Sequence, residues 1–143
     1  METNYRKVVI LRGIPGSGKT TYAKELVSQG FKRVNKDDIR HMINSYSLDN
    51  ADERLIHIMQ DYIIKTLMFF GRNIVIDNTH AKEKYVTELV KTIKEYDKIV
   101  NYDYGISIEV IDTPLEDCLV RNSQRENPVF EEVIRKMYRE LHS

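Results

Sequence analysis

The sequence predicts an α/β fold, built on a central, mostly parallel sheet of about four to five strands flanked by helices. Short apolar runs typical of strands recur along the chain, and segments with helical spacing separate them; the runs lie at 7–12, 31–35, 73–77 and 106–111. A glycine-rich turn joins the first of these strands to the first helix. Because parallel strands need crossover connections, both observations favour a parallel sheet over an antiparallel one.

The turn after the first strand has the spacing of a phosphate-binding (Walker A) loop, G-x-x-x-x-G-K-[ST], and a helix-like segment at 21–29 follows it. Its glycines allow successive backbone N–H groups to point at a phosphate, while Lys19 adds a positive charge and Thr20 offers a hydroxyl to Mg²⁺. The dipole of the helix adds to the attraction for an anion. The pattern therefore predicts a site for ATP or another nucleoside triphosphate with Mg²⁺, formed by Gly13, Ile14, Pro15, Gly16, Ser17, Gly18, Lys19, Thr20 and Thr21.

A polar cluster, Asn35-Lys36-Asp37-Asp38-Ile39-Arg40, follows the second strand. Loops at the carboxyl ends of parallel strands line the ligand crevice, so we expect this cluster to face the same cleft as the phosphate loop. A carboxylate here could accept a proton from an attacking hydroxyl, and Arg40 is placed to grip an anion. The alternative is that Asp37 or Asp38 only caps a helix at 38–43.

The helix expected at 51–70 has apolar residues at three- and four-residue steps, with further apolar residues widening the stripe, so we expect it to be well buried. The strand after it ends at Asp77-Asn78-Thr79-His80. An acid at the end of a short apolar strand resembles a Walker B element, which holds Mg²⁺ directly or through water, and Asp77 is the candidate. For His80, a turn or cap is favoured over a role as ligand or base.

Two helices and a strand are expected in the second half of the chain before the last helix at 130–141. The segment 84–96 has one apolar face, made by Val86, Leu89, Val90 and Ile93. Thr113-Pro114 suggests a helix start with threonine as the cap, and that helix should run to about Glu126.

Arg121 and Arg125 are four residues apart and should share one face of that helix. Arginines brought over a triphosphate stabilise charge on the transferring group, so the segment at about 114–128 is predicted to be a lid. The alternative is that both arginines are solvated near a helix C-terminus.

The composition favours a single domain over residues 1–143, with no membrane partner. Because 22 Lys and Arg balance 22 Asp and Glu, the net charge cannot hold nucleic acid by itself, and any such contact must be local. The single cysteine, Cys118, fits a small buried side chain in a reducing compartment. The longest apolar runs are too short to cross a bilayer, so we expect a soluble, cytoplasmic protein.

Taken together, these elements resemble the kinase half of phage-type bifunctional 5′-polynucleotide kinases over essentially the whole chain. Besides the three motifs already described, Arg121-Asn122-Ser123-Gln124-Arg125 and Met137-Tyr138 carry the resemblance. It implies a P-loop kinase fold with an arginine-bearing helical lid. It also implies transfer of the γ-phosphate of ATP to the 5′-OH end of DNA or RNA.

The resemblance also implies roles for single residues. Asp37 matches the general base and Arg40 matches the residue that grips the 3′-phosphate of the acceptor. Lys19 and Thr20 match the triphosphate and magnesium contacts. On the lid, the essential arginine and a second donor contact are matched by Arg125 and Arg121.

Two other functions stay open. One is a kinase of the same fold for a sugar, nucleoside or antibiotic, and the other is a nucleotide-switched binding module. A polynucleotide acceptor favours basic residues leading away from Asp37, and the candidates are Arg33, Lys36, Arg40 and His41. The D-x-D-x-[TV] motif of the phosphatase half is absent from the sequence, so we expect no phosphatase domain and no 3′-phosphatase activity.

Overall fold

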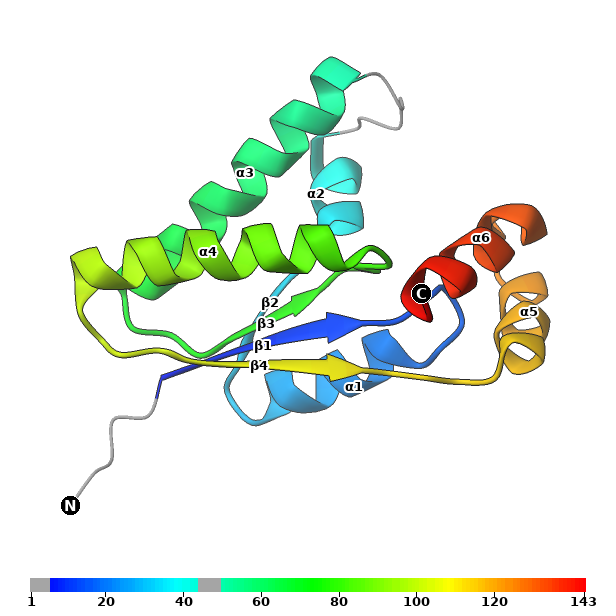
Figure 1. Ribbon diagram of the computed structural model, residues 1–143, viewed down its shortest axis with the longest axis horizontal. Coiled ribbons are helices and arrows are strands. Elements are labelled where there is room, and N and C mark those ends of the chain that lie inside the picture. Colours follow the sequence, from blue (N-terminus) through cyan, green and yellow to red (C-terminus); the bar gives the residue numbers. More distant parts are fainter. Residues whose placement is uncertain (1–5, 44–49) are drawn as a thin grey trace.

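The computed structural model describes residues 6–43 and 50–143, and in this part of the chain the parallel α/β fold is confirmed (Figure 1). Strands and helices alternate in the order β1 (Lys7–Arg12), α1 (Lys19–Ser28), β2 (Lys32–Val34), α2 (Lys36–Ile43), α3 (Asn50–Phe69), β3 (Ile74–Asp77), α4 (Glu83–Val100), β4 (Gly105–Val110), α5 (Leu115–Ser123) and α6 (Glu131–Leu141). The four strands form one sheet in the order β2-β3-β1-β4, and every pairing is parallel.

The register of this sheet brings the carboxyl ends of three strands together. Leu11 near the end of β1 pairs with Asp77 at the end of β3, and Val34 at the end of β2 pairs with Ile76. The phosphate loop, the Asn35 cluster and the Asp77 turn therefore leave the sheet at the same edge, as ligand sites in parallel sheets do.

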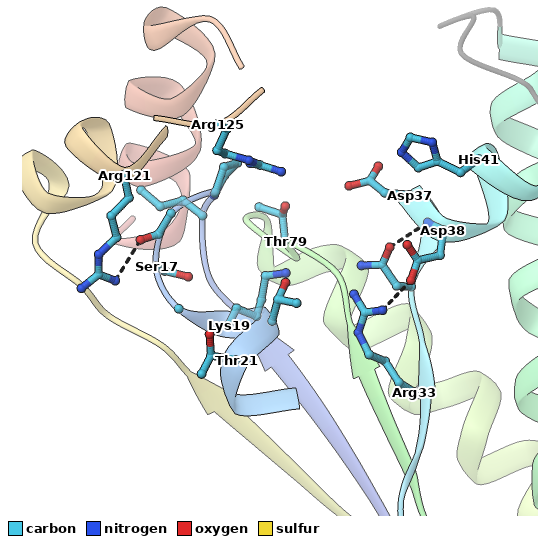
Figure 2. Close-up of a pocket in the computed structure, with 16 residues that line it drawn as sticks. Ser17, Lys19, Thr21, Arg33, Asp37, Asp38, His41, Thr79, Arg121 and Arg125 are labelled. Atoms are coloured by element: carbon cyan, nitrogen blue, oxygen red, sulfur yellow. Dashed lines mark hydrogen bonds and ion pairs between the residues drawn. The ribbon is translucent and has the colours of Figure 1, made fainter. Parts of the chain in front are cut away.

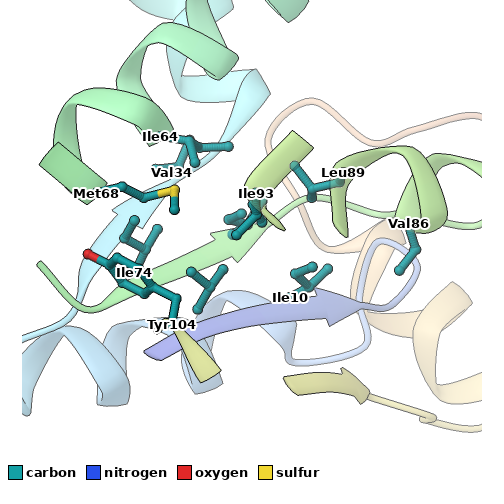
Figure 3. Packing of buried hydrophobic residues seen from close by; sticks show 11 residues of the cluster. Ile10, Val34, Ile64, Met68, Ile74, Val86, Leu89, Ile93 and Tyr104 are labelled. Atoms are coloured by element: carbon teal, nitrogen blue, oxygen red, sulfur yellow. The ribbon is translucent and has the colours of Figure 1, made fainter. Parts of the chain in front are cut away.

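The two faces of the sheet are covered by different helices (Figure 1). Val8 and Ile10 of β1 pack into a core with residues of α3 and α4, including Ile64 and Ile93 (Figure 3). Val9 and Leu11 point to the other face and pack with α1. This alternation along β1 follows from the two-residue period of a strand, and burial on both faces explains its uninterrupted apolar run.

The helices α5 and α6 form a separate unit beyond the carboxyl edge of the sheet (Figure 1). Their core joins Cys118 and Ile134 to Ile14 of the phosphate loop, and all three side chains are buried. Cys118 is a free, buried cysteine, as predicted. The helix α5, which carries Arg121, is thus attached to the loop by apolar packing. It ends at Ser123 and not at about Glu126, so Arg125 lies beyond the helix and the expectation that both arginines share one of its faces was wrong.

One expectation about burial was wrong. The helix α3 is covered on one side only, and its buried residues are Ile56, Gln60, Ile64 and Met68, whereas Tyr62 is 75% exposed. The predicted stripe followed the many apolar residues of the segment, but α3 packs through one narrow four-residue row while its outer face stays open. In the described part of the chain, no helix is both long and apolar enough to cross a bilayer.

Candidate active site

The phosphate loop connects β1 to α1 through two glycines in left-handed conformations, Gly16 with φ 85° and Gly18 with φ 93°. A Cβ on Gly16 would lie 2.5 Å from the carbonyl oxygen of Cys118, so glycine is required there for space as well as for conformation. Among the described residues, no side chain caps the N-terminus of α1 at Gly18. The first N–H groups of the helix therefore remain available to an anion.

Thr113, just before α5, and Arg121 of α5 both hold this loop. Thr113 Oγ1 donates a hydrogen bond of 2.6 Å to the carbonyl oxygen of Ser17, and Arg121 Nη1 donates one of 3.2 Å to that of Gly16. The helix α5 begins after Pro114 without a side-chain cap from any described residue, so the prediction that Thr113 caps it was wrong. Its hydroxyl binds the loop instead. The Oγ atom of Ser17 is buried and has no hydrogen-bond partner within the described residues.

A cavity of about 520 Å³ opens in front of the loop, and Figure 2 shows the side chains that line it. The loop, Arg121 and Arg125 lie on one side, and Asp37 and His41 of α2 lie on the other. The lining residues are Ile14, Pro15, Gly16, Ser17, Gly18, Lys19, Thr20, Thr21, Arg33, Asn35, Asp37, Asp38, His41, Thr79, Arg121 and Arg125. The structure thus brings Asp37 and the predicted donor residues, except Gly13, to one cavity, whose volume is ordinary for a small-ligand site.

Asp77 lies fully buried beneath this cavity and binds two cations. Lys19 Nζ lies 2.7 Å from its Oδ1 atom, and Arg33 Nε lies 2.7 Å from its Oδ2 atom. Burial lowers the pKa of Arg33, but the bonds to Asp77 and to Asp38 outweigh burial and raise the pKa above its usual value. Arg33 therefore stays charged and links β2, β3 and α2.

The start of α2 is capped by Asn35. Its Oδ1 atom accepts a hydrogen bond of 2.9 Å from the backbone N–H of Asp38, and its amide donates to the carbonyl oxygen of Asp77. The expectation that Asp37 or Asp38 caps this helix was therefore wrong. The helix begins at Lys36, two residues earlier than expected, so both acids fall inside its first turn, where negative charge is favourable. This leaves the side chain of Asp37 77% exposed toward the cavity.

Arg40 and Lys36 lie outside the lining of the cavity. Arg40 donates 2.8 and 2.7 Å hydrogen bonds to the carboxylate of Glu53 on α3, and a third of 2.6 Å to Asp37. The hydrogen bonds between Arg40 and Glu53 raise the pKa of Arg40 and lower the pKa of Glu53. For each group this effect is larger than the opposing effect of burial. Because Arg40 also bonds to Asp37, it orients this carboxylate in this structure. Burial lowers the pKa of Lys36.

The turn after β3 closes the floor of the site. Thr79 accepts a 3.0 Å hydrogen bond at its carbonyl oxygen from the N–H of Gly13, which ties the two strand ends together. His80 has a φ of 48°, and its Nδ1 atom lies 2.7 Å from the carbonyl oxygen of Leu11. Burial lowers the pKa of His80 to about 4, so the ring is neutral near pH 7 and donates from Nδ1. His80 is a turn residue, as favoured by the sequence.

Several residues of the site were missed by sequence reasoning. Glu53 bonds to Arg40, which in turn bonds to Asp37, and nothing in the local sequence of Glu53 points to this role. Asn35 belongs to the predicted cluster and its residue type favours an N-cap, but the cap was expected at Asp37 or Asp38. Thr79 is the easiest to find, because it directly follows a strand that ends in an acid. Arg33 was considered only as an acceptor contact, and its bond to Asp77 spans 44 positions of the chain.

Comparisons with known proteins show what this chain is similar to. A family model described as an AAA domain matches residues 8–142. A protein of Autographa californica nuclear polyhedrosis virus, named as a bifunctional polynucleotide kinase/RNA ligase, is 27% identical over 95% of this chain and 21% of its own length. A chain of the Pnkp1/Rnl/Hen1 RNA repair complex superposes with a TM-score of 0.84 at 28% identity, covering 99% of this chain and 45% of that one.

A gluconokinase from Sinorhizobium meliloti 1021 superposes with a TM-score of 0.61 at 14% identity, over 97% of this chain and 77% of that one, a likeness that shows the fold alone. The chain thus spans about a fifth of the viral relative and less than half of the matched chain of the RNA repair complex. With the family model covering nearly every residue and the phosphate loop in its expected place, the chain belongs to the AAA domain family and has a P-loop kinase fold.

Proposed function

We propose that this chain transfers the γ-phosphate of ATP to the 5′-hydroxyl end of DNA or RNA. The observation that carries the proposal is the single cavity in which Asp37 faces the phosphate loop and the lid arginines. The polynucleotide kinase named in the viral relative and the RNA repair complex that contains the matched chain support a nucleic-acid acceptor.

The donor would bind at the phosphate loop. Backbone N–H groups at the start of α1 and the ammonium group of Lys19 suit the β- and γ-phosphates, and Arg121 and Arg125 line the same cavity. Arg121 already lies close to the loop, because its guanidinium bonds to Gly16. The donor contacts proposed for Gly13 to Thr21 follow from the same geometry, with Gly13 supporting the loop through Thr79.

The residues present fit a magnesium ion that arrives with the nucleotide. The hydroxyl of Thr20 and the carboxylate of Asp77 are hard oxygen ligands, which Mg²⁺ prefers. No group of three or more His, Cys, Asp or Glu side chains among the described residues is arranged as a metal site, so phosphate oxygens would supply much of the coordination. Bound there, the ion would neutralise charge on the phosphates.

Asp37 would act as the general base. Its carboxylate accepts the proton of the 5′-hydroxyl as that oxygen attacks the γ-phosphorus, while the bond from this phosphorus to the β–γ bridging oxygen breaks and ADP leaves. The bond from Arg40 fixes the carboxylate in place. Lys19 and Arg125 would balance the charge on the transferring group. Direct contact of Arg40 or Lys36 with acceptor phosphates stays a prediction from the resemblance.

Within this proposal, residues 1–143 act as one kinase domain with a lid at about 114–128 and no phosphatase activity. A reducing, cytoplasmic setting is part of the proposal, because Cys118 is buried and free.

The test is transfer of labelled γ-phosphate from ATP and Mg²⁺ to 5′-OH oligonucleotides, with DNA and RNA in parallel. We expect labelled oligonucleotide from the wild-type protein, and a loss of about 10²- to 10⁴-fold in Asp37→Asn, since a positioned base contributes that much. The matched control is Asp103→Asn, the same substitution at an exposed position beside β4. ATP turnover without labelled oligonucleotide would overturn the acceptor class and favour a small-molecule kinase or a nucleotide-switched module.

A further inference from the structure

The buried carboxylate of Asp77 is shared by two cations that reach it from different elements. Lys19 approaches from the phosphate loop and Arg33 from β2, each at 2.7 Å and each on its own carboxylate oxygen. The side chains of Lys19 and Arg33 are 11% and 20% exposed, while Asp77 is fully buried. The three groups form a compact set beneath the donor cavity.

This arrangement affects how easily Lys19 can move. To contact the phosphates of a nucleotide, Lys19 must leave Asp77, and a buried carboxylate without a partner is strongly unfavourable. With Lys19 as its only cation, Asp77 would hold the lysine back. Arg33 removes that obstacle because it stays on Oδ2 when Oδ1 is vacated.

The position of Arg33 is fixed by a second acid. Besides Nε on Asp77, its Nη1 atom bonds to Asp38 in the first turn of α2, so the planar guanidinium is held at both ends. Figure 2 shows Arg33 at the floor of the cavity, near Lys19 and below Asp38. Its place does not depend on a bound nucleotide.

We infer that Arg33 is a positioning residue for Lys19, acting as the permanent countercharge of Asp77 so that Lys19 is released to the phosphates of the donor. The inference rests on the proposed donor site but not on the nature of the acceptor. Arg33 itself contacts neither the phosphates nor the acceptor in this role. Its effect therefore appears in nucleotide affinity, even without a metal ion or an acceptor.

The experiment measures the affinity of the full chain for ATP by calorimetry in EDTA, which excludes any effect of Asp77 on Mg²⁺. We expect Arg33→Gln to weaken binding about tenfold or more, because the neutral amide leaves Lys19 as the only cation on the carboxylate. The matched control is Lys32→Gln, which removes a positive charge from an exposed position of the same strand. This control should stay within about twofold of wild type. Thermal melts confirm that each variant is folded.

Two further variants separate this role from a merely structural one. Arg33→Lys keeps a positive charge beside Asp77 but cannot span Asp77 and Asp38 as the guanidinium does, so it should bind ATP more tightly than Arg33→Gln and less tightly than wild type. In the double variant Arg33→Gln/Asp77→Asn, the carboxylate that holds Lys19 is neutral, and ATP affinity should return to nearly the wild-type value. A general loss of structure would not be repaired by a second substitution in the same cluster.

The outcomes are distinct. Wild-type affinity in Arg33→Gln would overturn the inference, and so would a weakened Arg33→Gln that Asp77→Asn fails to restore. Both leave the proposed function intact. Failure of the wild-type protein to bind ATP, with or without Mg²⁺, would instead overturn the donor site and with it both proposals.

Discussion

Lys19 Nζ lies 2.7 Å from Oδ1 of Asp77, so the lysine of the phosphate loop is bound to a buried acid on the neighbouring strand. The pairing of β1 with β3 makes this contact possible, because their carboxyl ends are in register. It fixes the lysine at the floor of the cavity in the absence of a nucleotide. In the proposed donor site, binding a triphosphate would therefore exchange one anionic partner of Lys19 for another.

Replacing the lysine tests its share of the donor site. We expect Lys19→Met to lower kcat/KM for ATP by about 10²-fold or more, because a cation that stabilises the transferring phosphate is lost. The fold should persist, since Arg33 still pairs with Asp77. Lys24→Met, on the exposed face of α1, is the control and should transfer phosphate at the wild-type rate. Equal rates in the two variants would exclude Lys19 from the reaction.

The proposed role of Arg125 is tested by steady-state kinetics. We expect Arg125→Ala to lower kcat by about 10²- to 10³-fold with a smaller effect on ATP affinity, because its charge would act mainly on the transition state. Arg139→Ala removes an exposed arginine from the last turns of α6 and should leave kcat unchanged. If Arg125→Ala changes only KM, the arginine binds ground and transition states equally.

Gly16 is required both for its conformation and for the space beside Cys118. We expect Gly16→Ala to abolish ATP binding and to lower stability by more than Gly30→Ala, whose glycine has a φ of 102° but no atom within 4 Å of the added Cβ. Gly30→Ala should cost about 1–2 kcal/mol from backbone strain alone. Urea unfolding and ATP titration of the two variants check this. Similar losses in both would mean that the contact with Cys118 is easily relaxed.

The buried His80 makes stability depend on pH. Burial lowers its pKa from 6.5 to about 4, so between these values the unfolded chain binds a proton that the folded protein does not. The contribution of the neutral His80 ring to the free energy of unfolding is thus complete above pH 6.5. It is lost as the pH falls toward 4, and the loss is at most about 3 kcal/mol. The free energy of unfolding should decrease less steeply over this window in His80→Asn, as measured by urea unfolding at several pH values. Parallel curves would contradict a neutral buried ring.

The parts of the fold that could be predicted are those with local causes. The apolar run of β1 and the glycine spacing behind it fixed the strand, the loop and the helix, and β1 has the predicted bounds. Asp37 could be assigned to the cleft of the phosphate loop because strand ends of a parallel sheet meet at one edge.

The contacts that sequence reasoning missed depend on residues far apart in the chain. Nothing near Arg33 indicates that its partner is Asp77, and nothing near Arg40 indicates Glu53. The wrong cap expected at Thr113 has a similar origin, whereas the one expected at Asp37 or Asp38 failed locally, because the neighbouring Asn35 caps α2. Thr113 has the right residue type for a cap, yet the carbonyl oxygen of Ser17, 96 positions away, takes its hydroxyl. Local preference was outweighed by a tertiary hydrogen bond in that case.

The side chain of Asn122 closes the segment that carries Arg125. Its amide donates 2.7 Å to the carbonyl oxygen of Val129 and its oxygen accepts 3.0 Å from the N–H of the same residue, a pair of bonds shielded by 95% burial of Asn122. The six residues between them form a ring that is complete before any nucleotide arrives. The backbone entropy of ordering the segment that carries Arg125 is thus lost once, during folding, rather than each time a ligand binds.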